Sequence, residues 1–201
     1  MTLAECASTF AQMILVEGAL DAPDMSDVMK ARLLDMELSN SIWYLIEDPI
    51  CFEFEKALYE ERQKGELSSS QLTDIIVGIQ RKVLGDVLVE GREFPYLWVR
   101  RGHFYLTNRT FANYPYTFGY LISRGLFAMF LAEGQAFLPR YEEFLRLTGR
   151  DTCENVARLS IGRDLESPDF WVEAIQSMGE PLNRLEALLP KVLPTAGTTD
   201  S

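Results

Sequence analysis

The chain has 201 residues, of which 47% are hydrophobic and 24% charged, the balance of an ordinary globular protein. Asp and Glu (30) outnumber Lys and Arg (19), and the formal net charge of −11 disfavours binding to a phosphate backbone and predicts no nucleic-acid partner. The first residues lack the basic region of a secretory signal, and no stretch reaches the roughly 18 apolar residues of a membrane span, so we expect no membrane partner.

The first part of the chain predicts two long helices. Residues 3–20 carry apolar side chains at helical spacing, and residues 13–16 are apolar all round, which predicts burial on more than one side. Residues 26–47 form the second helix, with Ser26 as its N-cap. The expected core stripes are Leu3, Ala7, Phe10 and Ile14, then Met29, Leu33, Met36 and Trp43.

The middle of the chain is less regular. Asp48-Pro49 ends or kinks the second helix and opens the segment 50–63. Ser68 and Gln71 form a capping box for a helix that closes at Gly85. Residues 86–113 are interrupted by Gly and Pro, and a short strand is possible at 96–99.

Helical spacing resumes at 116–132 and 135–148, and a short helical turn follows Thr152. Ser167-Pro168 opens the last helix, in which Pro181 introduces a kink. The side chains expected to face inward there are Trp171, Ile175 and Met178. With no internal repeat and no linker, the sequence predicts a single all-α multi-helix domain over residues 1–193 and a disordered tail over 194–201.

Several polar residues could carry chemistry. Glu5 either favours the dipole at a helix start or serves as a metal-ligating or catalytic carboxylate. His103, the single histidine, is either a partly buried or surface residue or a donor presented on a loop. The tyrosine-rich run 111–120 predicts either core packing or a polar, tyrosine-lined cleft, because buried hydroxyls need partners.

The three cysteines, Cys6, Cys51 and Cys153, are odd in number and scattered. This usage predicts reduced thiols in a cytoplasmic compartment rather than a disulfide frame or a zinc knuckle. Isolated cysteines mostly behave as small apolar core residues. A hydrolase that pairs one of these thiols with His103 is therefore the weakest of the functional alternatives.

Four segments resemble, in order and at suitable spacing, the C-terminal part of oligoendopeptidase F, a bacterial zinc peptidase related to thimet oligopeptidase. They are Ala4–Phe10, Gly102–Tyr105, Asn113–Tyr120 and Ile161–Trp171. The resemblance covers roughly residues 2–188. It implies an all-α fold corresponding to the C-terminal part of a thimet oligopeptidase-like catalytic domain, and a metalloendopeptidase that hydrolyses short peptides.

The resemblance also implies roles for particular residues. Glu5 matches the family's third zinc ligand, a glutamate in an Ala-Glu-x-Ala-Ser-Thr context. His103 matches a histidine that lines the substrate cleft and binds the carbonyl oxygen as it becomes an oxyanion. The family's downstream tyrosines are matched best by Tyr116 and Tyr120 in that catalytic role, and the substrate-binding matches are Tyr105 and Tyr114.

The chain departs from the family in one respect. A His-Glu-x-x-His helix supplies two zinc ligands and the general base, and a sequence with one histidine cannot contain it. We therefore expect the C-terminal portion of such a peptidase, inactive as an isolated chain, with zinc in the complete enzyme and none held tightly by this chain alone. The expected partners are a peptide substrate and an N-terminal lobe carrying the motif, or a second copy of the chain. The alternative is a non-catalytic helical interaction module derived from that peptidase.

Overall fold

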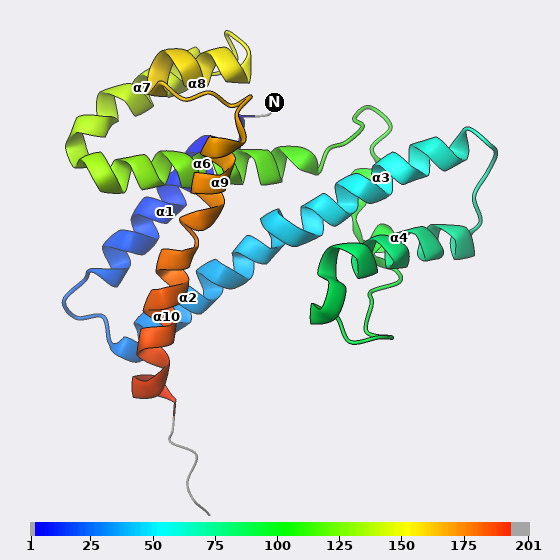
Figure 1. The fold of residues 1–201 in the computed structure, drawn as a ribbon, viewed down its shortest axis with the longest axis horizontal. Helices are drawn as coiled ribbons and strands as arrows, with labels where there is room; N and C mark the ends of the chain where they lie inside the picture. Colours follow the sequence, from blue (N-terminus) through cyan, green and yellow to red (C-terminus); the bar gives the residue numbers. More distant parts are fainter. Residues whose placement is uncertain (1–2, 194–201) are drawn as a thin grey trace, which may run out of the picture. The chain divides into compact units, whose positions relative to one another are not determined.

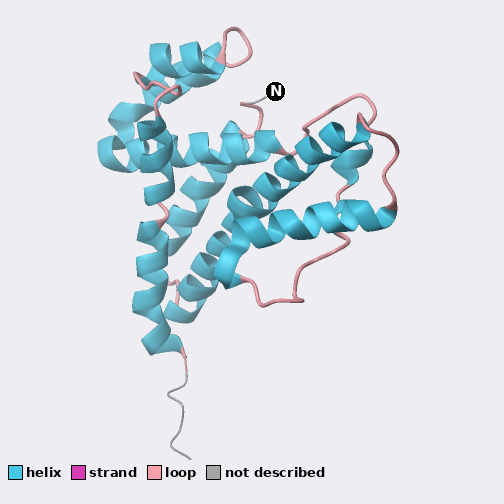
Figure 2. Ribbon diagram, turned by 45° about the vertical axis from the view of Figure 1, so that its right-hand side comes forward, coloured by secondary structure: helices cyan, strands magenta, loops and turns pink. Residues whose placement is uncertain are grey.

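The computed structural model describes residues 3–193, and within that range it contains helices and loops and no strand (Figures 1 and 2). The predicted all-α fold is confirmed. The chain forms two compact units, unit 1 from Met1–Ser41 and Phe118–Ser201, and unit 2 from Ile42–Thr117. Compact units are not the same as independently folding domains, so a single domain over 1–193 stays a prediction. The predicted disordered tail, 194–201, lies outside the described residues.

The helices follow one another through most of the described chain. The α-helices are α1 (Cys6–Leu20), α2 (Asp27–Ile42), α3 (Asp48–Arg62), α4 (Ser69–Leu84), α5 (Leu97–Arg100), α6 (Tyr114–Glu133), α7 (Leu138–Leu147), α8 (Cys153–Ile161), α9 (Pro168–Gln176) and α10 (Gly179–Val192). Shorter helical turns are the π-helical η1 (Trp43–Glu47) and the 3₁₀ turns η2 (Gly85–Val87), η3 (Gly102–Tyr105) and η4 (Gly134–Phe137).

Aromatic packing forms the centre of unit 1. The Phe10 ring of α1 stacks on Tyr141 of α7, with centroids 4.1 Å apart, and meets Phe127 of α6 edge-on at 6.2 Å. On α6, a Cβ at Gly125 would overlap the Phe170 ring of α9. The lack of a side chain at Gly125 therefore lets α9 pack directly against α6. In the same unit α7 packs along α8 (Figure 1).

Unit 2 has its own hydrophobic core on α3, α4 and α5, formed by Ile50, Cys51, Phe54, Ile76 and Leu97. The predicted capping box of α4 is present, because Ser68 accepts from the Gln71 N–H and Gln71 accepts from the Ser68 N–H. The buried Gln80 amide holds the irregular segment after α4 through two hydrogen bonds to the Phe94 backbone, of 2.9 and 3.0 Å. These bonds satisfy backbone groups that regular secondary structure does not pair.

The predicted core stripes of the first two helices are wrong in part. Leu15 is 73% exposed, so α1 is not buried on several sides, and Met29 and Met36 of α2 are 55% and 48% exposed. The buried face of α2 instead includes Leu34 and the polar Glu37. Apolar periodicity assigns the largest apolar side chains to the inside, and it cannot identify a buried face that includes a carboxylate. Ala7, Ile14 and Trp43 are also exposed, in contrast to the prediction.

Three predicted elements also differ from the structure. The possible strand at 96–99 is the start of helix α5, and the helical turn after Thr152 is the full helix α8, capped by the Thr152 side chain. The last helix is two, α9 and α10, and the break comes before Pro181, which lies in the first turn of α10 where proline is tolerated. Ile175, predicted to face inward, is 51% exposed.

The helical stretch Tyr114–Leu147 is long and apolar enough to cross a membrane by length and composition. Core helices of soluble proteins pass the same test. Within unit 1 this stretch contains the buried Ser123 and Arg124, whose side chains are hydrogen-bonded to other parts of that unit. The expectation of no membrane partner stays a prediction.

Gly125 provides a test of this packing. Gly125→Ala places a methyl group in the Phe170 ring, and we expect it to lower the free energy of unfolding by about 1–3 kcal/mol, the usual cost of overpacking a core. Gly18→Ala is the matched control, because Gly18 lies in α1 of the same unit with open space around it. That change should raise stability by about 0.5–1 kcal/mol through helix propensity. Urea unfolding followed by circular dichroism measures both, and equal effects would contradict the packing.

Candidate functional site

Glu5 lies at the N-cap position of α1, and its side chain makes no capping hydrogen bond to the helix backbone. Ser8 Oγ instead donates to Glu5 Oε2 at 3.1 Å, and Thr9 Oγ1 donates to the Glu5 main-chain oxygen at 2.7 Å. The Glu5 carboxylate therefore does not cap helix α1. Ser8 Oγ also lies 3.0 Å from the Glu5 main-chain oxygen, so its one proton is shared between the main chain and the carboxylate.

Gly119 of α6 lies directly against the start of α1. A Cβ at Gly119 would be 3.2 Å from Glu5 Cβ, tighter than nine in ten real Cβ contacts, so the absence of a side chain at Gly119 eases this approach. Ser123, one turn further along α6, places its Oγ 2.9 Å from both the Cys6 and the Gly119 main-chain oxygens. Thr9 Oγ1 is hydrogen-bonded to the same Ser123 hydroxyl. Two of the segments that carry the family resemblance are thus adjacent in unit 1, although more than 100 residues separate them in sequence.

In unit 2 the structure brings His103 and Tyr116 together. Tyr116 Oη is 3.5 Å from His103 Nε2, and the two rings meet edge-on with centroids 5.6 Å apart. In the described part of the chain, His103 Nδ1 is buried without a hydrogen-bond partner. A buried ring nitrogen without a partner costs about 1–3 kcal/mol. The pair therefore has hydrogen-bonding capacity that this part of the chain leaves unused.

Two arginines immediately before His103 hold its segment in unit 2. Arg101 Nη2 pairs with Asp48 Oδ1 at 2.8 Å, and Arg100 Nη2 pairs with Glu47 Oε1 at 2.7 Å. Both guanidinium groups also lie over the Trp43 ring, 5.0 and 5.2 Å from its centroid. Burial raises the pKa of Asp48 to about 6, and Arg101 opposes that rise. Because η3 begins directly after Arg101, these contacts position the turn that carries His103.

The remaining predicted tyrosines lie in different surroundings. Tyr120 is buried in unit 1, only 3% exposed, and its hydroxyl donates to Met178 Sδ at 3.3 Å. Tyr105 is 57% exposed, and its hydroxyl donates to the Trp98 main-chain oxygen. The Tyr114 ring meets Phe52 edge-on at 6.3 Å. The catalytic role of Tyr120 and the substrate-binding roles of Tyr105 and Tyr114 stay predictions.

Sequence reasoning missed a buried polar group next to these residues in unit 2. Glu55, 2% exposed, accepts a 2.7 Å hydrogen bond from the Phe111 N–H, and Phe111 has a left-handed φ of 53°. Asn113 is fully buried, and neither polar atom of its side chain has a partner in the described residues. Strained backbone and unpaired buried polar groups are both typical of functional sites. Asn113 lies in a matching segment, whereas nothing in the sequence marks Glu55.

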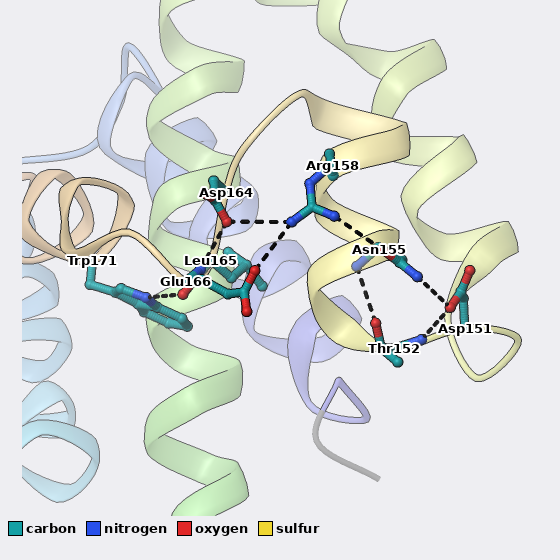
Figure 3. Close-up of polar contacts among 8 residues, drawn as sticks. All are labelled: Asp151, Thr152, Asn155, Arg158, Asp164, Leu165, Glu166 and Trp171. Atoms are coloured by element: carbon teal, nitrogen blue, oxygen red, sulfur yellow. Dashed lines mark hydrogen bonds and ion pairs between the residues drawn. The ribbon is translucent and has the colours of Figure 1, made fainter.

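The segment Ile161–Trp171, the last of the four that resemble the family, has structural contacts in unit 1 (Figure 3). Trp171 Nε1 donates to the Leu165 main-chain oxygen at 2.9 Å, and Arg158 of α8 pairs with Glu166 at 3.4 Å. Gly162, with a left-handed φ of 69°, ends α8. These contacts stabilise the connection between α8 and α9, so its polar residues have a structural role there.

Two of the three cysteines, Cys6 and Cys51, are not suited to act as nucleophiles. Burial raises the pKa of both Cys6 and Cys51 to about 12. The thiolate is the nucleophile, and at neutral pH these two thiols stay protonated. Their positions in the cores of units 1 and 2 agree with the expected packing role.

The zinc implied by the resemblance does not fit the described residues alone. In residues 3–193 no three His, Cys, Asp or Glu side chains converge as a metal-binding group. Catalytic zinc takes about three protein ligands. Glu5 offers a single carboxylate, so a zinc centre that included it would need its remaining donors from elsewhere.

Comparison with known proteins supports a relation to the oligoendopeptidase F family. The chain is 28% identical over 191 residues to Oligopeptidase PepF of Bacillus subtilis (strain 168). The match covers 94% of this chain and 28% of the relative, so the chain spans little more than a quarter of that protein's length. No family model matches the chain. No solved structure matches it at a significant level.

The pKa of Asp48 predicts a pH dependence. Because the folded pKa of about 6 lies above the ordinary 3.8, the folded state binds more protons than the unfolded state between these values, and Asp48 lowers stability as pH rises through this window. The stability of the wild type relative to Asp48→Asn should therefore fall by up to about 3 kcal/mol between pH 4 and pH 7. Denaturant unfolding at each pH measures it, and a constant difference would contradict the assignment. Asp86→Asn, at an exposed aspartate of unit 2, controls for loss of a charge.

Proposed function

We propose that this chain is the C-terminal portion of an oligoendopeptidase F-like metalloendopeptidase that hydrolyses short peptides. One observation carries the proposal: Gly119 of one family-like segment packs so closely on Glu5 of another that a Cβ there would lie 3.2 Å from Glu5 Cβ, within a chain related to PepF over 94% of its length. A glycine favours this close approach, since a side chain there would require Glu5 to shift by a few tenths of an ångström. Shared motifs that also meet in space are stronger support than motifs in sequence alone.

Each residue has a role in this proposal. Glu5 supplies the third zinc ligand, and an N-terminal lobe with a His-Glu-x-x-His motif supplies the other two ligands and the general base. His103 and Tyr116 donate hydrogen bonds to the peptide carbonyl oxygen as it gains negative charge, and Tyr120 assists them. Such donors accelerate a reaction because they bind the transition state more strongly than the substrate. Tyr105 and Tyr114 contact the bound peptide. The complete enzyme works in the cytoplasm, where the thiols remain reduced.

A second candidate is a non-catalytic helical interaction module that retains the fold. Exposed apolar side chains on α1 and α2 favour it, because Leu15, Met29 and Met36 are 73%, 55% and 48% exposed. Exposed large apolar side chains can contribute to a protein interface. In the peptidase proposal, the N-terminal lobe covers the same side chains. The two candidates therefore differ in the partner that covers these side chains and in whether the assembly is active.

Reconstitution separates these candidates. The chain is mixed with a polypeptide from the part of PepF that it does not match and that carries His-Glu-x-x-His, and cleavage of an internally quenched short peptide is followed with zinc present. We expect the mixture to cleave the peptide and each component alone to be inactive. If the chain instead forms a stable homodimer that does not bind the added lobe, and no peptide is cleaved, the result would support the interaction module and overturn the proposal.

The oxyanion role is tested in the reconstituted enzyme. Tyr116→Phe removes the hydroxyl beside His103 and should lower kcat about 10²-fold or more with little change in KM, as loss of one oxyanion donor does. Tyr96→Phe is the matched control, because Tyr96 is a 61% exposed tyrosine of the same unit outside the proposed site. A change in KM alone would indicate that Tyr116 contacts the substrate in the ground state.

A further inference from the structure

Unit 1 contains a cavity of about 390 Å³ that neither candidate function uses. It lies between α1, α2, α6 and α10, and its walls are mainly apolar, with Met13, Leu20, Leu34, Phe127, Leu131 and Pro181 among them. A volume of this size falls within the range of small-molecule sites, about 300–1,000 Å³. The cavity therefore has room for a compact ligand with an apolar body.

One wall of the cavity carries a buried carboxylate with an unused oxygen. Glu37 of α2 lines the cavity and is only 5% exposed, and its Oε2 has no hydrogen-bond partner among the residues that the structure describes. Burial raises the pKa of Glu37, and the charge of Arg124 opposes that rise. An unpaired buried oxygen is costly, and the cost is larger for a charged group. A ligand that donates to Oε2 would remove this cost.

The cationic groups around the cavity are already engaged. Arg124 Nη2 donates to the Ser177 main-chain oxygen at 2.9 Å, and its Nε donates to Ser177 Oγ at 3.3 Å. Arg184 pairs with Glu17 at 2.8 Å. The lining contains three glutamates and two arginines, a formal charge of −3 + 2 = −1. Both the net charge and the unpaired group therefore favour a cation over an anion.

We propose that this cavity binds a small primary amine with an aliphatic or aromatic body, with its ammonium group at Glu37 Oε2 and its body against the apolar walls. Charge-assisted hydrogen bonds of this kind are shorter and stronger than neutral ones, and the low dielectric of the cavity strengthens them further. The site is independent of the proposed peptidase activity, because its lining includes neither Glu5 nor Tyr120 nor any residue of unit 2.

Three linear probes with six carbon atoms each test the site on the full chain: n-hexylammonium, n-hexanol and hexanoate. Isothermal titration at pH 7 should show one saturable site for the amine, at least tenfold weaker binding of the alcohol, and weaker binding still of the acid. Because the comparison uses the unaltered protein, it decides the proposal without any variant. Tighter binding of hexanoate, or equal binding of amine and alcohol, would overturn it, as would the absence of saturable amine binding.

Variants then assign the contact. Glu37→Gln keeps the shape of the side chain and removes the charge, so amine affinity should fall at least tenfold while alcohol affinity changes less than twofold. Glu180→Gln is the control, since Glu180 also lines the cavity but its side chain is 58% exposed and screened by solvent, so amine affinity should fall less than twofold. Thermal unfolding checks that both variants fold. An unchanged amine affinity in Glu37→Gln would contradict the assignment of Oε2.

Discussion

The close approach of α6 to the start of α1 is the constraint on which the rest of unit 1 depends. Gly119 allows the two backbones to meet beside Glu5, and Ser123 and Thr9 join them by buried hydrogen bonds. Further along the same pair of helices, Phe10 inserts between the aromatic rings of α6 and α7. A larger residue at position 119 would push Glu5 and the start of α1 away by a few tenths of an ångström and so strain these neighbouring contacts.

In unit 2, ion pairs fix the position of the segment that carries His103. The pairs from Arg100 and Arg101 to Glu47 and Asp48 anchor a short irregular segment that hydrophobic burial alone would hold poorly. Taking Asp48 out of water is costly, as its raised pKa shows, and the paired guanidinium offsets part of that cost. The segment so held carries His103, the residue on which the proposed oxyanion role depends.

Exposed and buried side chains in unit 1 depart from the usual pattern in a way that bears on both proposals. Leu15 and Met29 are exposed, whereas Glu37 and Arg124 are buried. The interaction-module candidate assigns the exposed apolar residues to a macromolecular partner, and the proposed amine site assigns the buried Glu37 to a small ligand in the cavity. Because Leu15 and Met29 are not among the residues that line the cavity, a partner that covers them need not occupy it.

Sequence patterns determined the all-α class, the capping box at Ser68 and the segments that carry the family resemblance, since these depend on local propensity and on the order of residues. Only the tertiary structure decided which face of α2 is buried, that Glu5 meets Gly119, and that His103 meets Tyr116. It also identified Glu55, for which no local signal exists. The physical reason is that burial is a property of what surrounds a side chain. Residues far apart in the chain supply those surroundings, and periodicity within one helix does not record them.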